Sequence, residues 1–100
     1  MSSETYHRIV FYSLVAISIV ACSPALFIPT AENSAKAGVT LEQLNMGRKL
    51  YVSHCGSCHS LYLPKQYNKE KWAENLNEMQ VKAKISDAEK ATILKYITSQ

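Results

Sequence analysis

Two cysteines and a histidine form a pattern that can hold a cofactor or perform redox chemistry. Cys55 and Cys58 are separated by two residues, and His59 follows directly. This C-x-x-C-H pattern is the attachment signature of a c-type haem, although two cysteines at this spacing also occur in zinc sites and redox dithiols. The spacing suits haem because both sulfurs can reach the vinyl groups on one porphyrin edge. The adjacent histidine then lies below the iron.

The zinc and dithiol alternatives each need features that the rest of the chain lacks. A structural zinc site normally combines two pairs of ligands from separate places, and only His54 lies close enough to join the motif. The remaining candidates, His7 and Cys22, lie in the N-terminal region. A thioredoxin-like dithiol expects a βαβ pattern, which is missing. The sequence therefore favours covalent haem.

Helical signals run through the part of the chain that carries the motif. Capping residues mark helix starts, because a side-chain oxygen at the cap satisfies a free N–H of the first turn. The expected helices are 41–54 after Thr40 and Gln43, one that begins near Asn68, and one that begins with Ser86 and Glu89. No segment alternates strictly between apolar and polar residues, as a strand would. We therefore expect an all-α domain.

Each expected helix has an apolar face that would pack in the core. The faces are Leu44, Gly47, Tyr51 and Cys55 on the first helix, Trp72, Leu76, Met79 and Ala83 on the second, and Ala91, Leu94 and Ile97 on the third, flanked by Ile93 and Tyr96. The first of these faces places the motif at the end of a core-facing helix.

The N-terminal region has the layout of an export signal. Arg8 precedes an apolar stretch, 9–28, that contains no charged residue, and this order is typical of secretion signals. Within it, the four residues that end at Cys22 read I-V-A-C and resemble a bacterial lipobox, so Cys22 would be lipidated. Two alternatives remain open. The chain could be cleaved at the A-x-A pattern of 35–37, or 9–28 could be retained as a membrane span.

These patterns divide the chain into an export signal or membrane anchor (1–21), a linker (22–39) and a folded domain (40–100). Prolines, a glycine and small polar residues are typical of a linker. The net charge of the whole chain is +3, and no basic block with interleaved aromatic residues points to nucleic-acid binding. A domain this small is marginally stable, and a bound cofactor would supply part of its core.

The residues around the motif resemble a known family. The spacing G-x3-Y-x3-C-x2-C-H, from Gly47 to His59, is similar to the first helix of small monohaem class I c-type cytochromes of the short-loop bacterial type. The resemblance extends over about residues 40–98. It implies a cytochrome c fold of three to four helices around one covalent haem c. It also implies that Gly47 lets the first helix cross the last one closely.

The resemblance further implies the groups that would hold the iron. Cys55 and Cys58 would carry the thioether bonds, and His59 would bind the iron on one side. A methionine usually occupies the opposite side in this family, and Met79 is the candidate because Met46 lies on the helix that carries the motif. Family members often place this methionine in a long loop, whereas Met79 falls in a helical pattern. Packing without ligation is the alternative role for it.

The surroundings of His59 can also be anticipated. A ligand histidine needs an acceptor for its second ring nitrogen, and we expect a backbone carbonyl near Leu63 or Pro64. We expect His54 to lie at the surface, because it abuts the motif and cannot easily reach the far side of the iron.

The resemblance implies an electron carrier and not an enzyme. The expected protein is exported, held at the membrane by its N-terminal segment, and passes single electrons between a redox donor and acceptor. Exposed lysines after the motif could dock an acidic partner. The alternatives are a fixed cytochrome subunit of a larger membrane complex and a haem-based gas sensor.

Overall fold

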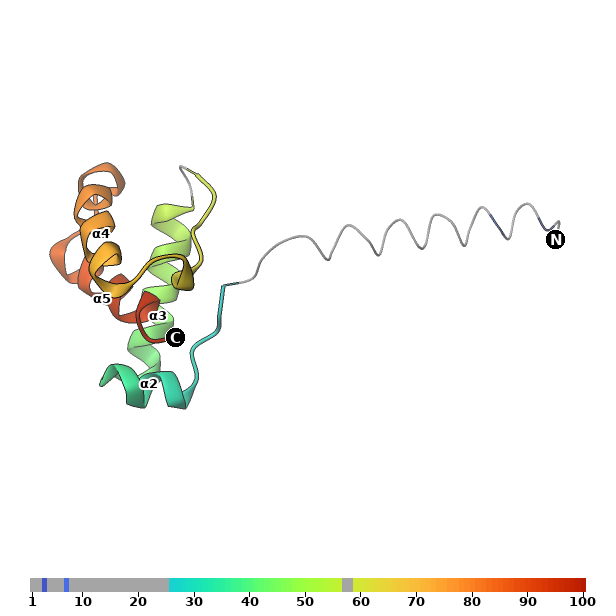
Figure 1. The fold of residues 1–100 in the computed structure, drawn as a ribbon, viewed down its shortest axis with the longest axis horizontal. Helices are drawn as coiled ribbons and strands as arrows, with labels where there is room; N and C mark the ends of the chain where they lie inside the picture. The colour runs from blue at the N-terminus through green and yellow to red at the C-terminus, as the bar shows by residue number, and fades with distance from the viewer. Residues whose placement is uncertain (1–2, 4–6, 8–25, 57–58) are drawn as a thin grey trace.

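The structure, a computed structural model, describes residues 3, 7, 26–56 and 59–100. Cys22, Cys58 and nearly all of the predicted export segment lie outside the described residues. The described helices are α2 (Ala31–Ala37), α3 (Leu41–Leu50), a π-helix (Tyr51–Cys55), a 3-10 helix (Pro64–Gln66), α4 (Lys69–Ala83) and α5 (Asp87–Ile97). This part of the chain contains no strand, which confirms the all-α fold (Figure 1). None of its helices is long and apolar enough to cross a membrane.

The predicted helix starts are all present. At the start of α3, the Gln43 amide N–H donates to Thr40 Oγ1 at 3.1 Å, and the Thr40 N–H donates to Gln43 Oε1 at 2.9 Å. Ser86 and Glu89 form the same reciprocal pair at the start of α5. Asn68 caps α4 with its side-chain oxygen. These bonds satisfy amides that the first helical turn leaves without a partner.

A close crossing of α3 and α5 organises the domain. Leu44 and Gly47 are the buried residues of α3, and Gly47 lies directly against α5. A Cβ atom at Gly47 would lie 2.4 Å from the Thr92 backbone oxygen and 2.7 Å from Tyr96 Cβ. Such separations are far shorter than van der Waals contact, so a larger residue would force the two helices apart. The expectation that the glycine permits a close crossing is confirmed.

The buried face of α5 differs from the expected one. Ile93 and Tyr96 are fully buried and Ile97 is 2% exposed, whereas Ala91 lies at the surface and Leu94 is partly buried. The expectation that Ala91 belongs to the core is wrong. Apolar residues adjoin one another along α5, so spacing alone permits more than one face. The packing of α5 against both α3 and α4 selects the face that is buried.

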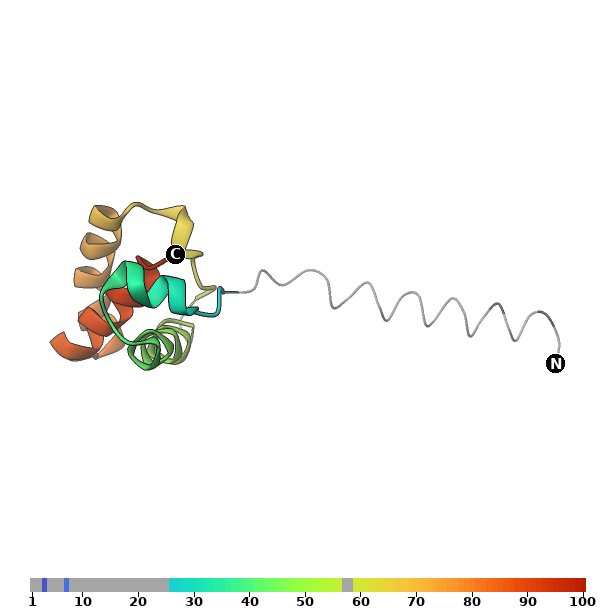
Figure 2. The ribbon, with the colours of Figure 1, turned by 90° about the horizontal axis from the view of Figure 1, so that it is seen from below.

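Residues 26–37, which fall in the predicted linker, pack against this domain. The Phe27 ring stacks on the Tyr96 ring with centroids 4.5 Å apart. The Phe27 carbonyl accepts hydrogen bonds from Tyr96 Oη at 2.7 Å and from Arg48 Nε at 3.2 Å. Asn33 of α2 donates to the Ser99 carbonyl at 2.9 Å. This N-terminal strap lies beside α3 and the C-terminal end of the chain (Figure 2).

Candidate functional site

Cys55 lies at the last turn of the helix that begins at Leu41. The expected α-helix over 41–54 is wrong in this turn, because α3 ends at Leu50 and Tyr51–Cys55 form a π-helix. Such i→i+5 turns are rare and are frequent at functional sites. Tyr51 and Cys55 are 3% and 8% exposed, and the π-helix contacts α4. The sequence carries no local signal for this wider turn. The turn occurs where the chain contacts α4.

His59 has a defined ring orientation. Its Nδ1 atom lies 2.7 Å from the Ser60 carbonyl oxygen. A carbonyl oxygen only accepts, so Nδ1 is the donor, and Nε2 is the ring nitrogen that remains for a metal in the neutral imidazole. The expectation of an acceptor at Leu63 or Pro64 is therefore wrong. The Pro64 carbonyl instead accepts a hydrogen bond from Trp72 Nε1 at 2.7 Å, because the buried indole of α4 reaches it.

Cys55, His59 and Met79 lie together along a cleft between the π-helix and α4. The cleft has two parts, with cavity volumes of about 200 and 140 Å³, and all three residues line both parts. The larger part also has an aromatic wall made by Tyr51, Tyr62, Tyr67 and Trp72. The structure thus brings together three of the four residues expected to hold the cofactor. The fourth, Cys58, lies outside the described residues.

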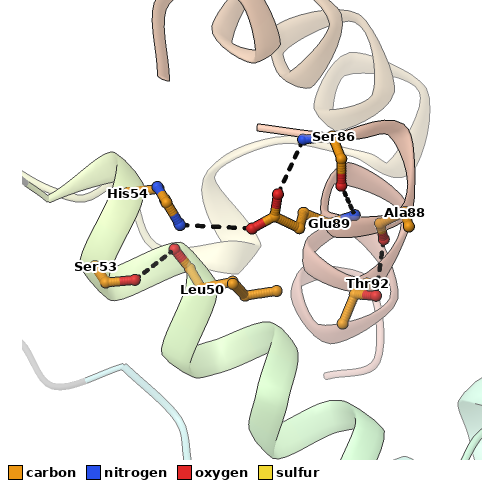
Figure 3. A network of polar contacts seen from close by, with 7 residues as sticks. All are labelled: Leu50, Ser53, His54, Ser86, Ala88, Glu89 and Thr92. Carbon is orange, nitrogen blue, oxygen red and sulfur yellow. Dashed lines mark hydrogen bonds and ion pairs between the residues drawn. The ribbon is translucent and has the colours of Figure 1, made fainter. Parts of the chain in front are cut away.

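His54 points toward α5 at one side of the cleft. Its Nε2 atom lies 3.6 Å from Glu89 Oε2, and both side chains are more than one-third exposed (Figure 3). The Ser86 backbone N–H, the Ser86 hydroxyl and, to a smaller extent, His54 lower the pKa of the Glu89 carboxyl. Since Glu89 also caps α5, this contact connects the residue before Cys55 with the start of the last helix.

Two hydrogen bonds attach the segment after His59 to the core. Tyr51 Oη donates to the Tyr62 carbonyl at 2.6 Å, and Trp72 donates to Pro64 as described above. Burial, followed by the nearby Cys55, raises the pKa of the Tyr51 phenol, so it remains a donor at neutral pH. Sequence reasoning missed the bond to Tyr62. The one signal for this bond in the sequence was that position 51 is tyrosine and not phenylalanine, because the hydroxyl of a buried tyrosine needs a partner.

Ring contacts continue from this segment to His59. The Tyr62 ring lies 5.4 Å from the His59 ring and 5.6 Å from the Tyr67 ring, measured between centroids. Tyr67 in turn lies 5.3 Å from Trp72, which lies 6.1 Å from Tyr51. These separations are typical of favourable aromatic pairs. A continuous set of aromatic side chains therefore connects the histidine with the buried core.

The residues of the cleft fit a covalently attached haem. A buried thiol, an imidazole with an available Nε2 and a thioether border one space, and aromatic rings line its larger part. Sulfur from a C-x-x-C-H motif, histidine and methionine are the groups that hold haem in cytochromes c. Apolar and aromatic walls also suit a flat, mostly apolar cofactor.

Comparison with known proteins gives one family. A family described as dihaem cytochrome c matches residues 51–100, which contain the motif, Met79, α4 and α5. The matching family is described as dihaem, whereas the resemblance noted above is to monohaem proteins. Comparison with curated proteins and with solved structures gives no match.

Proposed function

The chain belongs to the dihaem cytochrome c family, and from this premise we propose that it carries single electrons through one covalently bound haem. When bound, the haem would supply the one-electron couple. The chain's own residues hold and orient the group and restrict the access of water. Electron transfer of this kind needs no acid, base or nucleophile, so we propose a carrier and not an enzyme.

The shared cleft is the observation that carries this proposal. Cys55, His59 and Met79 come from different elements and border the same space. In the proposed site, Cys55 and Cys58 would carry the thioether bonds, and His59 Nε2 and the Met79 sulfur would be the iron ligands. Ligation by methionine and histidine favours the reduced iron and raises the potential.

The proposal of one haem per chain rests on the motif count. The sequence contains three cysteines, and Cys55 and Cys58 are the only two that form C-x-x-C-H. A second covalent haem would need a second motif. We therefore propose that this member of the family binds a single haem.

We propose that the protein works outside the cytoplasm, at a membrane. The export pattern and the lipobox-like residues before Cys22 support this location. Redox proteins would be its donor and acceptor, and exposed lysines could attract an acidic partner: Lys65, Lys69, Lys71, Lys82 and Lys84. The intact mass of the purified protein tests the anchor. A diacylglyceryl group on Cys22 supports a lipoprotein, whereas a retained Met1 supports the alternative of a fixed membrane subunit.

Optical spectra of the holoprotein test the site. We expect the wild-type protein to show a covalent haem in the pyridine haemochrome assay. We also expect a weak far-red band in the ferric state, as given by a methionine ligand, and no rapid CO binding in the ferrous state. Met79→Ala should lose the far-red band and gain CO binding, because one side of the iron becomes open. Met46→Ala is the matched control, since Met46 is 49% exposed on α3.

Three results would contradict parts of this proposal. Wild-type protein without covalent haem, after expression with the haem-attachment machinery, would refute the electron carrier. A far-red band that persists in Met79→Ala would refute Met79 as the ligand. Rapid CO binding by the wild-type ferrous protein would favour the gas sensor.

A further inference from the structure

Two buried tyrosines of the same core cluster each donate a hydrogen bond to a backbone carbonyl. Tyr51 Oη donates to the Tyr62 carbonyl at 2.6 Å, and Tyr96 Oη donates to the Phe27 carbonyl at 2.7 Å. Both side chains are almost fully buried, at 3% and 0% exposure. Each hydroxyl therefore attaches a segment without regular structure to a helix. Only Tyr51 does so beside the cleft.

The segment that Tyr51 holds lies between His59 and the 3-10 helix. Tyr62 follows His59 by three residues and belongs to no helix or strand. Tyr62 is 40% exposed, and its ring contacts the rings of His59 and Tyr67. After the contact of His59 with the Ser60 carbonyl and the packing of Leu61 against the core, the bond from Tyr51 is the first from the core to this backbone among the described residues. Local bonds between Leu63 and Gln66 follow, and then the bond from Trp72 to the Pro64 carbonyl.

The Tyr62 ring is the contact through which this attachment reaches His59. The two rings lie 5.4 Å apart between centroids and are inclined by 48°. A shift of the Tyr62 backbone would move its ring and remove this contact. The imidazole would then be oriented by its bond to Ser60 alone among the described contacts. Groups that orient a ligand histidine influence the electronic properties of the metal.

We propose that Tyr51 is a positioning residue for His59. Its hydroxyl holds the backbone at Tyr62, and the Tyr62 ring restricts the rotation of the imidazole. Tyr51 also lies on the π-helix that ends at Cys55, so one side chain connects the two ends of the C-x-x-C-H motif. This inference rests on the proposed function, because ring orientation affects the iron only if His59 binds it.

The test compares Tyr51→Phe with Tyr96→Phe in the full-length holoprotein. Each change removes one buried hydroxyl that donates to a backbone carbonyl, so the two variants are matched in the kind of bond that is lost. Readouts are the ferric EPR spectrum and the midpoint potential. We expect Tyr51→Phe to broaden or shift the EPR g values. At the wild-type midpoint, it should change the ratio of reduced to oxidised protein about threefold, which is about 28 mV for one electron. Tyr96→Phe should leave both readouts at their wild-type values.

Equal readouts for Tyr51→Phe and wild type would overturn the inference, and so would equal shifts in both variants. If Tyr51→Phe does not accumulate as holoprotein, Tyr62→Leu replaces it, since this change removes the ring beside His59 and leaves the Tyr62 carbonyl in place. A shift in that variant supports the inference, and its absence overturns it. Failure of the proposed function is separately visible, because the wild-type protein would then contain no covalent haem.

Discussion

Replacement of Gly47 by alanine would test how closely α3 and α5 must approach each other. The added methyl group would lie 2.4 Å from the Thr92 backbone oxygen and 2.7 Å from Tyr96 Cβ. Neither atom is the end of a flexible side chain, so a rotamer change cannot relieve the overlap. The helices would have to move apart, and the packing of the Tyr96 ring would change with them.

The magnitude follows from two opposing effects. Overpacking of a well-packed interface costs up to about 3 kcal/mol in unfolding free energy, and overlap with backbone atoms places Gly47→Ala at the upper end. Alanine is a better helix former than glycine and recovers about 1 kcal/mol. We therefore expect a net loss of about 2 kcal/mol. In a domain of this size, such a loss lowers the melting temperature by roughly 8–16 °C.

Urea unfolding followed by far-UV circular dichroism measures this loss. Asn45→Ala is the matched control, because Asn45 is exposed on the same helix, and its change should remain within about 0.5 kcal/mol. A Gly47→Ala protein that is as stable as the wild type would refute the close crossing. A large loss in Asn45→Ala would show instead that α3 does not tolerate substitution in general.

The two remaining predictions concern the strap and the buried phenols. Phe27→Ala should lower the unfolding free energy by about 1–2 kcal/mol, because a partly buried ring is removed from its stack on Tyr96; unchanged urea stability would mean that the strap is not docked in solution. Stability should also fall above pH 10. Burial raises the pKa of Tyr51 and Tyr96 above the ordinary value of 10.0, although Arg48 lowers that of Tyr96 in part. The folded chain then keeps protons that the unfolded chain releases, so each phenol contributes stability below pH 10 that is lost as the pH rises through its folded pKa. Each contributes a slope of at most about 1.4 kcal/mol per pH unit. Tyr51→Phe should reduce the slope measured by urea unfolding between pH 10 and 12, and an unaltered slope would contradict this account.

The sequence by itself determined the features that depend on residues close together in the chain. The motif indicates haem attachment because Cys55, Cys58 and His59 lie within one stretch of five residues. The starts of α3, α4 and α5 were predictable, because a capping residue and its partner are only three positions apart. The buried face of α3 was predictable for the same reason, and Gly47 was conspicuous as a glycine within a helix.

Tertiary structure alone decided the features that depend on contacts between distant segments. The face of α5 is chosen by α3 and α4, since apolar residues adjoin one another along that helix. The partner of a buried hydroxyl is set by whichever carbonyl the fold brings near, so the bond from Tyr51 to Tyr62 and the bond from Trp72 to Pro64 could not be read from spacing. The docking of Phe27 on Tyr96 joins residues that are 69 positions apart in the sequence. Local sequence specifies helices and reactive groups, whereas the cleft that Cys55, His59 and Met79 share exists only in the folded chain.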